Sequence, residues 1–207
     1  IAAMPVSMEE ASRFGILITD ENNRVTEFEE KPKVPRSNLA SMGIYIFNAK
    51  TMEEVLDNDY NDFGKEVIPM AIKSKKINSY IFDGYWEDIG TIKSFYEANI
   101  QLTEKEPSVN FYDEDEPIYT HMANLPPSKI NSAEINSTLT AEGCVITNCK
   151  LDRSIIGFRS ILESGTVLDG VVMMGADFYE NADERESNLR REIPDIGIGK
   201  NCHIRRT

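Results

Sequence analysis

The chain has 207 residues, 41% of them hydrophobic, so it can bury a core as one large domain or two small ones. Its 35 acidic residues outnumber 22 basic ones, and a surface with a formal net charge of -13 repels nucleic acid and anionic membranes. We therefore expect neither as a partner. Any phosphate must be met by a few local cations, which favours a small-molecule ligand.

The three cysteines are Cys144, Cys149 and Cys202, and they form no CxxC pair. They suggest neither a disulfide framework nor a zinc site, so we expect a reducing cytoplasm. The apolar runs are strand-sized and the first residues lack the charge of a signal peptide, so we predict no membrane span and no leader. The chain begins without Met and ends directly after a periodic segment, and we interpret it as a piece of a longer protein.

Strands and helices alternate over residues 1–105, which predicts an α/β domain. The first pair of strands flanks a polar turn at 20–23 and is predicted to form a hairpin. A nearly continuous apolar run at 42–47 predicts a central strand that is covered on both faces. The predicted strands are 14–18, 24–28, 42–47 and 77–82, and the predicted helices are 51–56, 63–74 and 91–104.

Lys31 and Glu30 close the predicted hairpin, just before Pro32. The proline biases Lys31 toward an extended backbone, from which its charge could meet a phosphate. Glu30 could accept hydrogen bonds from sugar hydroxyls. A solvated charged turn explains the same residues equally well.

Ser41 precedes the predicted central strand and could contact a sugar, although a serine there is usually a turn residue. The triplet of Asp62, Phe63 and Gly64 is similar to a kinase metal motif. The rest of the kinase signature is missing, so we assign Asp62 as the N-cap of the following helix.

Asp88 lies between bulky residues and a Gly-Thr helix start at Thr91. An isolated carboxylate of this kind can hold a divalent cation such as Mg²⁺, which is usually shared with phosphates. A packed strand end followed by a helix cap is the structural alternative.

Residues 106–127 are rich in Pro, Asp and Glu and predict a linker. Beyond them, apolar residues recur at every sixth position, with small residues such as Ser160 and Thr166 between them. This period predicts a parallel β-helix, interrupted by a charged helical segment at 179–192. Because the open ends of a β-helix stack readily on copies, we expect an oligomer. The repeats are Ile155, Ile161, Val167 and Met173, followed by Ile156, Leu162, Leu168 and Met174.

Six motifs follow one another along the chain: Ser12-Arg13-Phe14-Gly15, Glu29-Glu30-Lys31-Pro32, residues 39–45, Asp62-Phe63-Gly64-Lys65, residues 85–91, and Met174-Gly175-Ala176-Asp177-Phe178-Tyr179 within the repeats. Together they closely resemble the glucose-1-phosphate adenylyltransferase (ADP-glucose pyrophosphorylase) family over the whole chain. The resemblance implies the C-terminal portion of a Rossmann-like (GT-A) nucleotide-diphospho-sugar transferase domain at 1–105, a linker at 106–127 and a truncated left-handed β-helix at 128–207.

The resemblance implies transfer of AMP from ATP to glucose 1-phosphate, with release of pyrophosphate, by an allosteric cytoplasmic homotetramer of glycogen or starch synthesis. It assigns Glu30 and Ser41 to the glucose and Lys31 to the sugar phosphate. Asp88 matches one of two aspartates that hold the catalytic Mg²⁺. The positions that match the lining of the sugar pocket are Tyr45, Asp62, Phe63 and Trp86.

The family's Gly-rich nucleotide loop, its catalytic basic residues and its second metal aspartate are not in this chain, so we predict that the chain alone is inactive. Two alternatives remain open. The first is a non-catalytic regulatory subunit of the same family, which the intact Lys31, Ser41 and Asp88 disfavour. The second is a hexapeptide-repeat acyltransferase or scaffold, which would need a well-placed base, and His121 and His203 are the only histidines.

Overall fold

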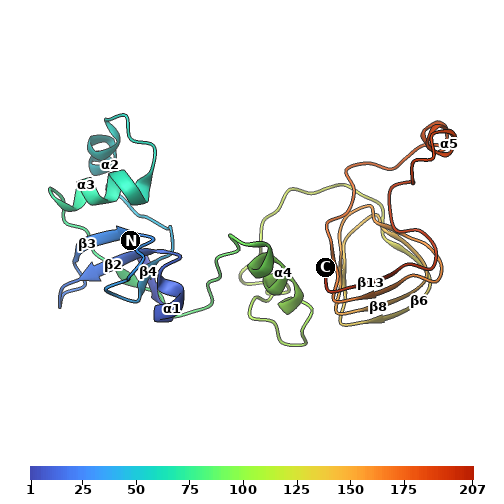
Figure 1. The fold of residues 1–207 in the computed structure, drawn as a ribbon, viewed down its shortest axis with the longest axis horizontal. Helices are drawn as coiled ribbons and strands as arrows, with labels where there is room; N and C mark the ends of the chain where they lie inside the picture. Colours follow the sequence, from blue (N-terminus) through green and yellow to red (C-terminus); the bar gives the residue numbers. More distant parts are fainter. The chain divides into compact units, whose positions relative to one another are not determined.

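The computed structural model describes all residues from 1 to 207, and the chain forms two compact units, Ile1–Trp86 and Glu87–Thr207. Figure 1 draws the first unit in blue to teal and the second in green to red. The two structural units are separated after Trp86. The domain boundaries at residues 105 and 127, which were predicted from the sequence, stay a prediction. No helix is long and apolar enough to cross a membrane.

The first unit is built on a five-stranded sheet with the order β3-β2-β4-β1-β5. β1 and β5 are parallel, and the other neighbours are antiparallel. The predicted hairpin is confirmed as β2 and β3, and its turn is held by Asp20, whose Oδ1 accepts the backbone N–H groups of Asn22 and Arg24. The strands are β1 (Ala2–Pro5), β2 (Gly15–Thr19), β3 (Val25–Glu30), β4 (Leu39–Ser41) and β5 (Tyr80–Ile81).

Helices cover both faces of this sheet, because successive strand residues point to opposite sides. On one face Leu17 is buried with Ala3 and Val25 against Ile72 of α3. On the other face Ile16 is buried with Ala11 of α1. Figure 1 shows α2 and α3 over one side of the strands and α1 at the opposite side. The helices are α1 (Met8–Ala11), α2 (Ala49–Leu56), the π-helix η1 (Phe63–Val67) and α3 (Ile68–Ile72).

The predicted helices of this unit are confirmed, including the N-cap at Asp62, whose Oδ1 accepts the backbone N–H of Lys65 at 2.8 Å. The predicted strand at 77–82 is shorter than expected, because only β5 pairs as a strand within it.

The prediction of a central strand at residues 42–47 is wrong. The central strand is β4, which lies between β2 and β1 and ends at Ser41. The backbone then exchanges two more hydrogen bonds with Ala2, and residues 45–47 pair with no strand. Ile46 is consequently 94% exposed. An apolar run of this kind forms a strand only where a partner strand is long enough to pair with it.

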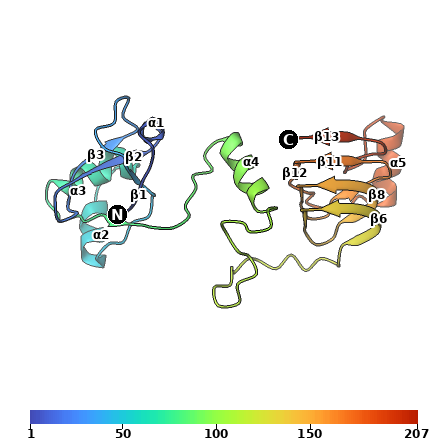
Figure 2. The same cartoon turned by 90° about the horizontal axis from the view of Figure 1, so that it is seen from below.

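The second unit starts with α4 (Ile92–Gln101), which confirms the helix that was predicted at 91–104. Thr91 caps it in a reciprocal arrangement with Ser94. The hydroxyl of Tyr96 donates to the carbonyl of Gly170 at 2.7 Å, which fastens α4 to the β-helix. Residues 106–127 form no helix or strand, as Figure 2 shows for the long connection after α4.

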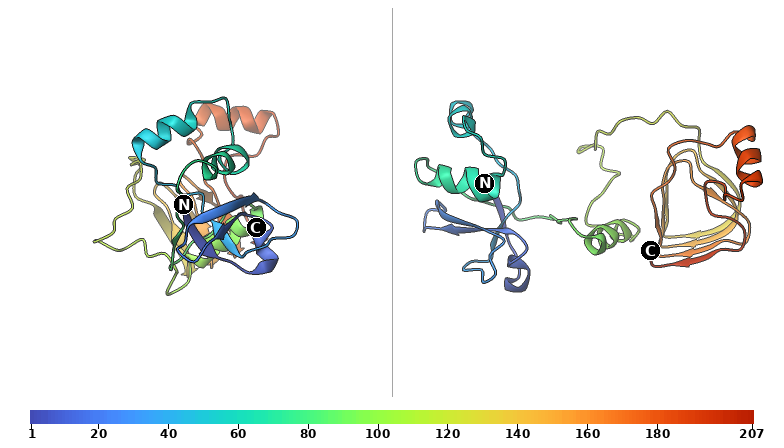
Figure 3. Two further views of the ribbon diagram at one scale, coloured as in Figure 1. Left: turned by 90° about the vertical axis from the view of Figure 1, so that its left-hand side faces the viewer. Right: turned by 45° about the horizontal axis from the view of Figure 1, so that its top comes forward.

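The remainder is the predicted parallel β-helix, whose stacked coils are drawn in yellow to red in Figure 3. Every strand pair in it is parallel. One sheet has the order β10-β8-β11-β13 with β6 beside β8, and the other is β12-β9-β7. The strands are β6 (Lys129–Asn136), β7 (Leu139–Thr140), β8 (Val145–Asp152), β9 (Ile155–Ile156), β10 (Ile161–Leu162), β11 (Val167–Asp169), β12 (Val172–Met173) and β13 (His203–Arg205).

The six-residue period fixes which side chains fill the β-helix. Ile156, Leu162 and Leu168 point inward and are at most 1% exposed. The fourth repeat departs from the pattern, since Met174 is 80% exposed where the chain leaves the coil. It leaves for the predicted charged interruption, which contains α5 (Ala182–Arg190).

Candidate functional site

The carboxylate of Glu30 lies at the end of β3, against two glycines from other elements. A Cβ atom on Gly64, in the first turn of η1, would stand 2.5 Å from Glu30 Oε2. A Cβ atom on Gly15, at the start of β2, would stand 3.0 Å from the same oxygen. Lys31 is the nearest cation, with its Nζ 3.9 Å from Glu30 Oε1. The lysine side chain is 65% exposed and free to turn toward an anion.

The backbone of Lys31 differs from the prediction, because its φ is +46°, in the left-handed region, and not extended. The N–H of Lys31 donates to the carbonyl of Phe14 at 3.1 Å, which adds a last rung to the hairpin before the chain leaves the sheet. This rung, and the turn that follows it, override the local preference of a residue before proline. A strained residue held by its surroundings is common at functional sites.

Arg36 ties the segment after Lys31 back to β3. Its Nε donates to Glu29 Oε1 at 2.6 Å and its Nη2 to Glu27 Oε2 at 2.5 Å. The hydrogen bond and charge of Arg36 lower the pKa of the Glu27 carboxyl, and the two glutamates raise the pKa of the arginine. Such a two-carboxylate clamp limits where the loop that carries Lys31 can move.

Three aromatic side chains form a cluster at the start of η1. The rings of Tyr45 and Phe63 are stacked with centroids 5.5 Å apart and planes 17° apart. Phe47 meets Phe63 edge-on at 6.2 Å. Asp62 directly precedes Phe63 in the sequence, and its carboxylate accepts the backbone N–H of Lys65 as the N-cap of η1. Such a stack presents an apolar wall to a flat or ring-shaped ligand.

Trp86 packs on Phe14, with ring centroids 5.6 Å apart and planes 59° apart. The Phe14 side chain packs against Ala11 and Ile16 on the α1 face of the sheet, while its backbone carbonyl accepts the Lys31 hydrogen bond. Among the predicted site residues, Glu30 therefore contacts Lys31, and Tyr45 stacks on Phe63. Asp62 caps η1, and Trp86 packs with Phe14 on the α1 face, whereas Phe47 of the aromatic cluster packs on Val55 and Ala71 of the α2 and α3 face.

Ser41 is not linked to the others by a direct contact. Ser41 ends β4, and its Oγ accepts the backbone N–H of Gly43 at 3.3 Å. This local contact is typical of a turn residue, which is the alternative role that the sequence left open for Ser41. Its hydroxyl proton is free to donate elsewhere.

Asp88 belongs to the second unit, two residues after Trp86. Its carboxylate oxygens lie 3.1 and 3.3 Å from the place where a Cβ of Gly90 would stand. The chain contains no group of three or more His, Cys, Asp or Glu side chains that could hold a metal ion. A single half-buried carboxylate fits Mg²⁺ as one ligand among several, since this ion is commonly held by one or two carboxylates together with phosphates and water.

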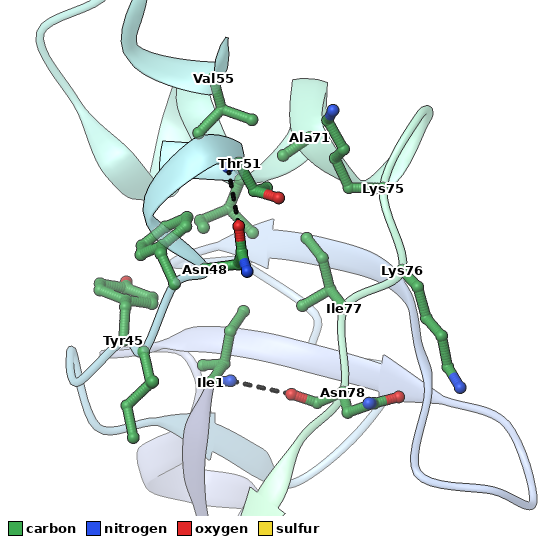
Figure 4. Close-up of a pocket in the computed structure, with 13 residues that line it drawn as sticks. Ile1, Tyr45, Asn48, Thr51, Val55, Ala71, Lys75, Lys76, Ile77 and Asn78 are labelled. Carbon is green, nitrogen blue, oxygen red and sulfur yellow. Dashed lines mark hydrogen bonds between the residues drawn. The ribbon is translucent and has the colours of Figure 1, made fainter. Parts of the chain in front are cut away.

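A cavity of about 260 Å³ opens beside the aromatic cluster, with Tyr45 at its rim (Figure 4). Its floor is apolar, formed in part by Val55 and Ala71. Asn48 lies on its wall, but the amide oxygen of Asn48 caps α2. The volume is below the usual range for ligand pockets, and no sequence motif had indicated it.

Gly15 and Gly64 are the functional neighbours that sequence reasoning missed. Both lie inside motifs that the sequence carried, but their common contact with Glu30 joins residues far apart along the chain. The only local signal is a glycine in the first turn of a helix, where a better helix former would be expected.

Comparison with known proteins gives two family matches that together cover most of the chain. The nucleotidyl transferase family matches residues 1–105, and the GLGC left-handed parallel β-helix domain matches residues 123–207. They confirm the predicted fold, a nucleotidyl transferase domain followed by a left-handed β-helix.

One curated relative is the chloroplastic/amyloplastic glucose-1-phosphate adenylyltransferase small subunit of Triticum aestivum. It is 41% identical over 233 residues, which cover 100% of this chain and 49% of the relative. The chain thus spans about half the length of the curated relative that it matches.

Proposed function

The chain belongs to the glucose-1-phosphate adenylyltransferases of the nucleotidyl transferase family, and from this premise we propose that its protein transfers AMP from ATP to α-D-glucose 1-phosphate. The products are ADP-glucose and pyrophosphate, for glycogen or starch synthesis. This chain supplies the glucose 1-phosphate side of the site and is inactive alone.

The observation that carries the proposal is the Glu30 carboxylate seated between Gly15 and Gly64 with the exposed ammonium of Lys31 beside it; Gly64 directly follows Phe63, which stacks on Tyr45. A carboxylate that accepts hydroxyl hydrogen bonds, an exposed ammonium group and aromatic walls are the groups that a sugar phosphate needs. Because the chain has a net charge of -13, most of its surface repels anions, so an anionic phosphate is drawn to the exposed ammonium group of Lys31 and not to the surface at large.

In the reaction, an oxygen of the sugar phosphate attacks the α-phosphorus of ATP, and the bond from that phosphorus to the pyrophosphate leaving group breaks. Lys31 holds the attacking phosphate, while Glu30 and the Ser41 hydroxyl fix the sugar and so align the oxygen. Asp88 would hold a Mg²⁺ ion. When bound, this ion neutralises phosphate charge as the transfer proceeds.

We extend the proposal to a homotetramer under allosteric control. The first coil of the β-helix supports self-association, because β6 pairs only with β8 and leaves Ile130 and Ile135 exposed by 49% and 41%. Their paired neighbours Ile146 and Leu151 are buried, so a second copy could cover the open end in the same way. A cytoplasmic location stays part of the proposal, in keeping with three free cysteines.

The direct test uses the full-length protein that contains this chain and follows pyrophosphate release from ATP. Release should depend on glucose 1-phosphate and on Mg²⁺, and the isolated chain should show none. Other nucleoside triphosphates and other sugar 1-phosphates serve as controls. If pyrophosphate release is independent of glucose 1-phosphate, or if saturable acetyl-CoA binding replaces it, the proposed function is wrong.

A further inference from the structure

The carboxylate of Glu30 occupies a notch that exists only because two residues lack side chains. Gly64 and Gly15 face this carboxylate from separate elements. A Cβ atom would stand 2.5 Å from Glu30 Oε2 on Gly64 and 3.0 Å from the same oxygen on Gly15. The side chain of Glu30 is 22% exposed, so one part is seated between the glycines and another part reaches solvent.

Backbone conformation does not explain the glycine at position 64. Gly64 is absent from the residues with positive φ, so alanine fits its backbone without strain. Glycine is also a poor helix former, and Gly64 lies within η1. The close approach of Glu30 is therefore the physical reason for a glycine here.

The atom that an added methyl group would strike is the end of a flexible side chain. Two Glu30 atoms, Oε2 and Cδ, lie 2.5 and 3.0 Å from the missing Cβ of Gly64, while the next neighbour, Asp62 Oδ1, lies at 3.5 Å. Alanine at position 64 would thus push the carboxylate aside with little strain on the fold. Gly15 differs, because its Cβ would also meet the ring of Phe28 at 2.4 Å.

We propose that Gly64 is a positioning residue: it sets where the Glu30 carboxylate stands and thereby determines the affinity of the site for the sugar of glucose 1-phosphate. This assignment rests on the proposed function, in which Glu30 binds the glucose. A hydrogen bond from a sugar hydroxyl to a carboxylate needs its donor and acceptor about 2.5 to 3.0 Å apart, so a shift of about 1 Å is enough to lose it.

The test measures KM for glucose 1-phosphate, KM for ATP and kcat in the full-length protein with three variants: Gly64→Ala, Glu30→Ala and the double variant. Gly199→Ala is the matched control, because nothing lies within 4 Å of its Cβ position and its φ is not positive. Gly64→Ala should raise KM for glucose 1-phosphate about tenfold, with KM for ATP and the thermal midpoint unchanged.

The double variant separates positioning from a structural role. Once Glu30→Ala has removed the carboxylate, Gly64→Ala should add less than about twofold to KM, since neighbouring effects on one group are not additive. An equal effect of Gly64→Ala in both backgrounds would show that the glycine acts on the fold and would overturn the proposal. So would an unchanged KM in Gly64→Ala.

The same data distinguish this inference from the proposed function. If Glu30→Ala raises KM for glucose 1-phosphate while Gly64→Ala does not, only the positioning role fails. If Glu30→Ala leaves KM unchanged, the sugar-binding role of Glu30 fails and the inference falls with it. The control Gly199→Ala should match the unmodified protein in every parameter.

Discussion

Replacing Ser154 with alanine should weaken the β-helix more than the loss of one oxygen atom suggests. Ser154 is fully buried at a corner of the coil, and its hydroxyl donates to the carbonyl of Asp152 at 2.8 Å. The same oxygen accepts the backbone N–H of Val171, from the next coil, at 3.1 Å. One hydroxyl thus joins two successive coils.

The size of the stability loss depends on the buried N–H of Val171, which loses its acceptor when Ser154 is replaced. Alanine removes a hydrogen bond that contributes about 1 kcal/mol and leaves the N–H of Val171, a residue only 3% exposed, without an acceptor. A stranded buried donor costs about 1 to 3 kcal/mol. We therefore expect the free energy of unfolding of the β-helix to fall by about 2 to 4 kcal/mol.

Urea denaturation and hydrogen exchange of the Val171 amide measure the two parts of this effect. The urea midpoint should fall by about 1 M, and the amide should lose protection. Ser187→Ala, on the exposed helix α5, is the matched control and should change stability by less than about 0.5 kcal/mol. If the two variants behave alike, the hydroxyl does not join the coils and the reasoning is refuted.

Two further predictions concern single carboxylates. Asp88→Asn in the full-length protein should lower kcat by more than it raises KM for glucose 1-phosphate, because the lost charge would serve the metal ion and not the sugar; normal turnover at limiting Mg²⁺ would contradict this role. Hydrogen bonds from Arg205 and Arg153 lower the pKa of Asp169 in the folded protein. The ionised Asp169 carboxylate therefore stabilises the fold above its unfolded pKa near 3.8, and this stabilisation is lost as the pH falls through the lowered folded pKa. Asp169→Asn should accordingly reduce the urea midpoint at neutral pH, and the difference from the unmodified protein should vanish in acid; a difference that persists below the folded pKa would exclude the linkage.

The β-helix could be predicted from the sequence because its period is local. Every sixth residue repeats the same environment, so Ile156, Leu162 and Leu168 were correctly expected to share one position in successive repeats. The small residues between them follow the same rule, and Ser160 and Thr166 are buried, with hydroxyls that donate to the carbonyls of Gly157 and Gly199.

The errors lie where a distant partner decides the outcome. The apolar run at 42–47 has the composition of a buried strand, but only a partner strand elsewhere in the fold can make it one, and residues 45–47 pair with none. The proline after Lys31 favours an extended backbone locally, yet the hydrogen bond to Phe14 sets a left-handed one. The seat of Glu30 depends on Gly64, which becomes its neighbour only after folding.

The central claim is that this chain binds the phosphate of glucose 1-phosphate through Lys31. In the full-length protein, Lys31→Ala should raise KM for glucose 1-phosphate about ten- to a hundredfold, as expected for one lost charge-assisted contact of roughly 1.5 to 3 kcal/mol. KM for ATP should not change, and Lys33→Ala, which removes another exposed charge nearby, should leave both constants as they are. An unchanged KM for glucose 1-phosphate in Lys31→Ala would contradict the account.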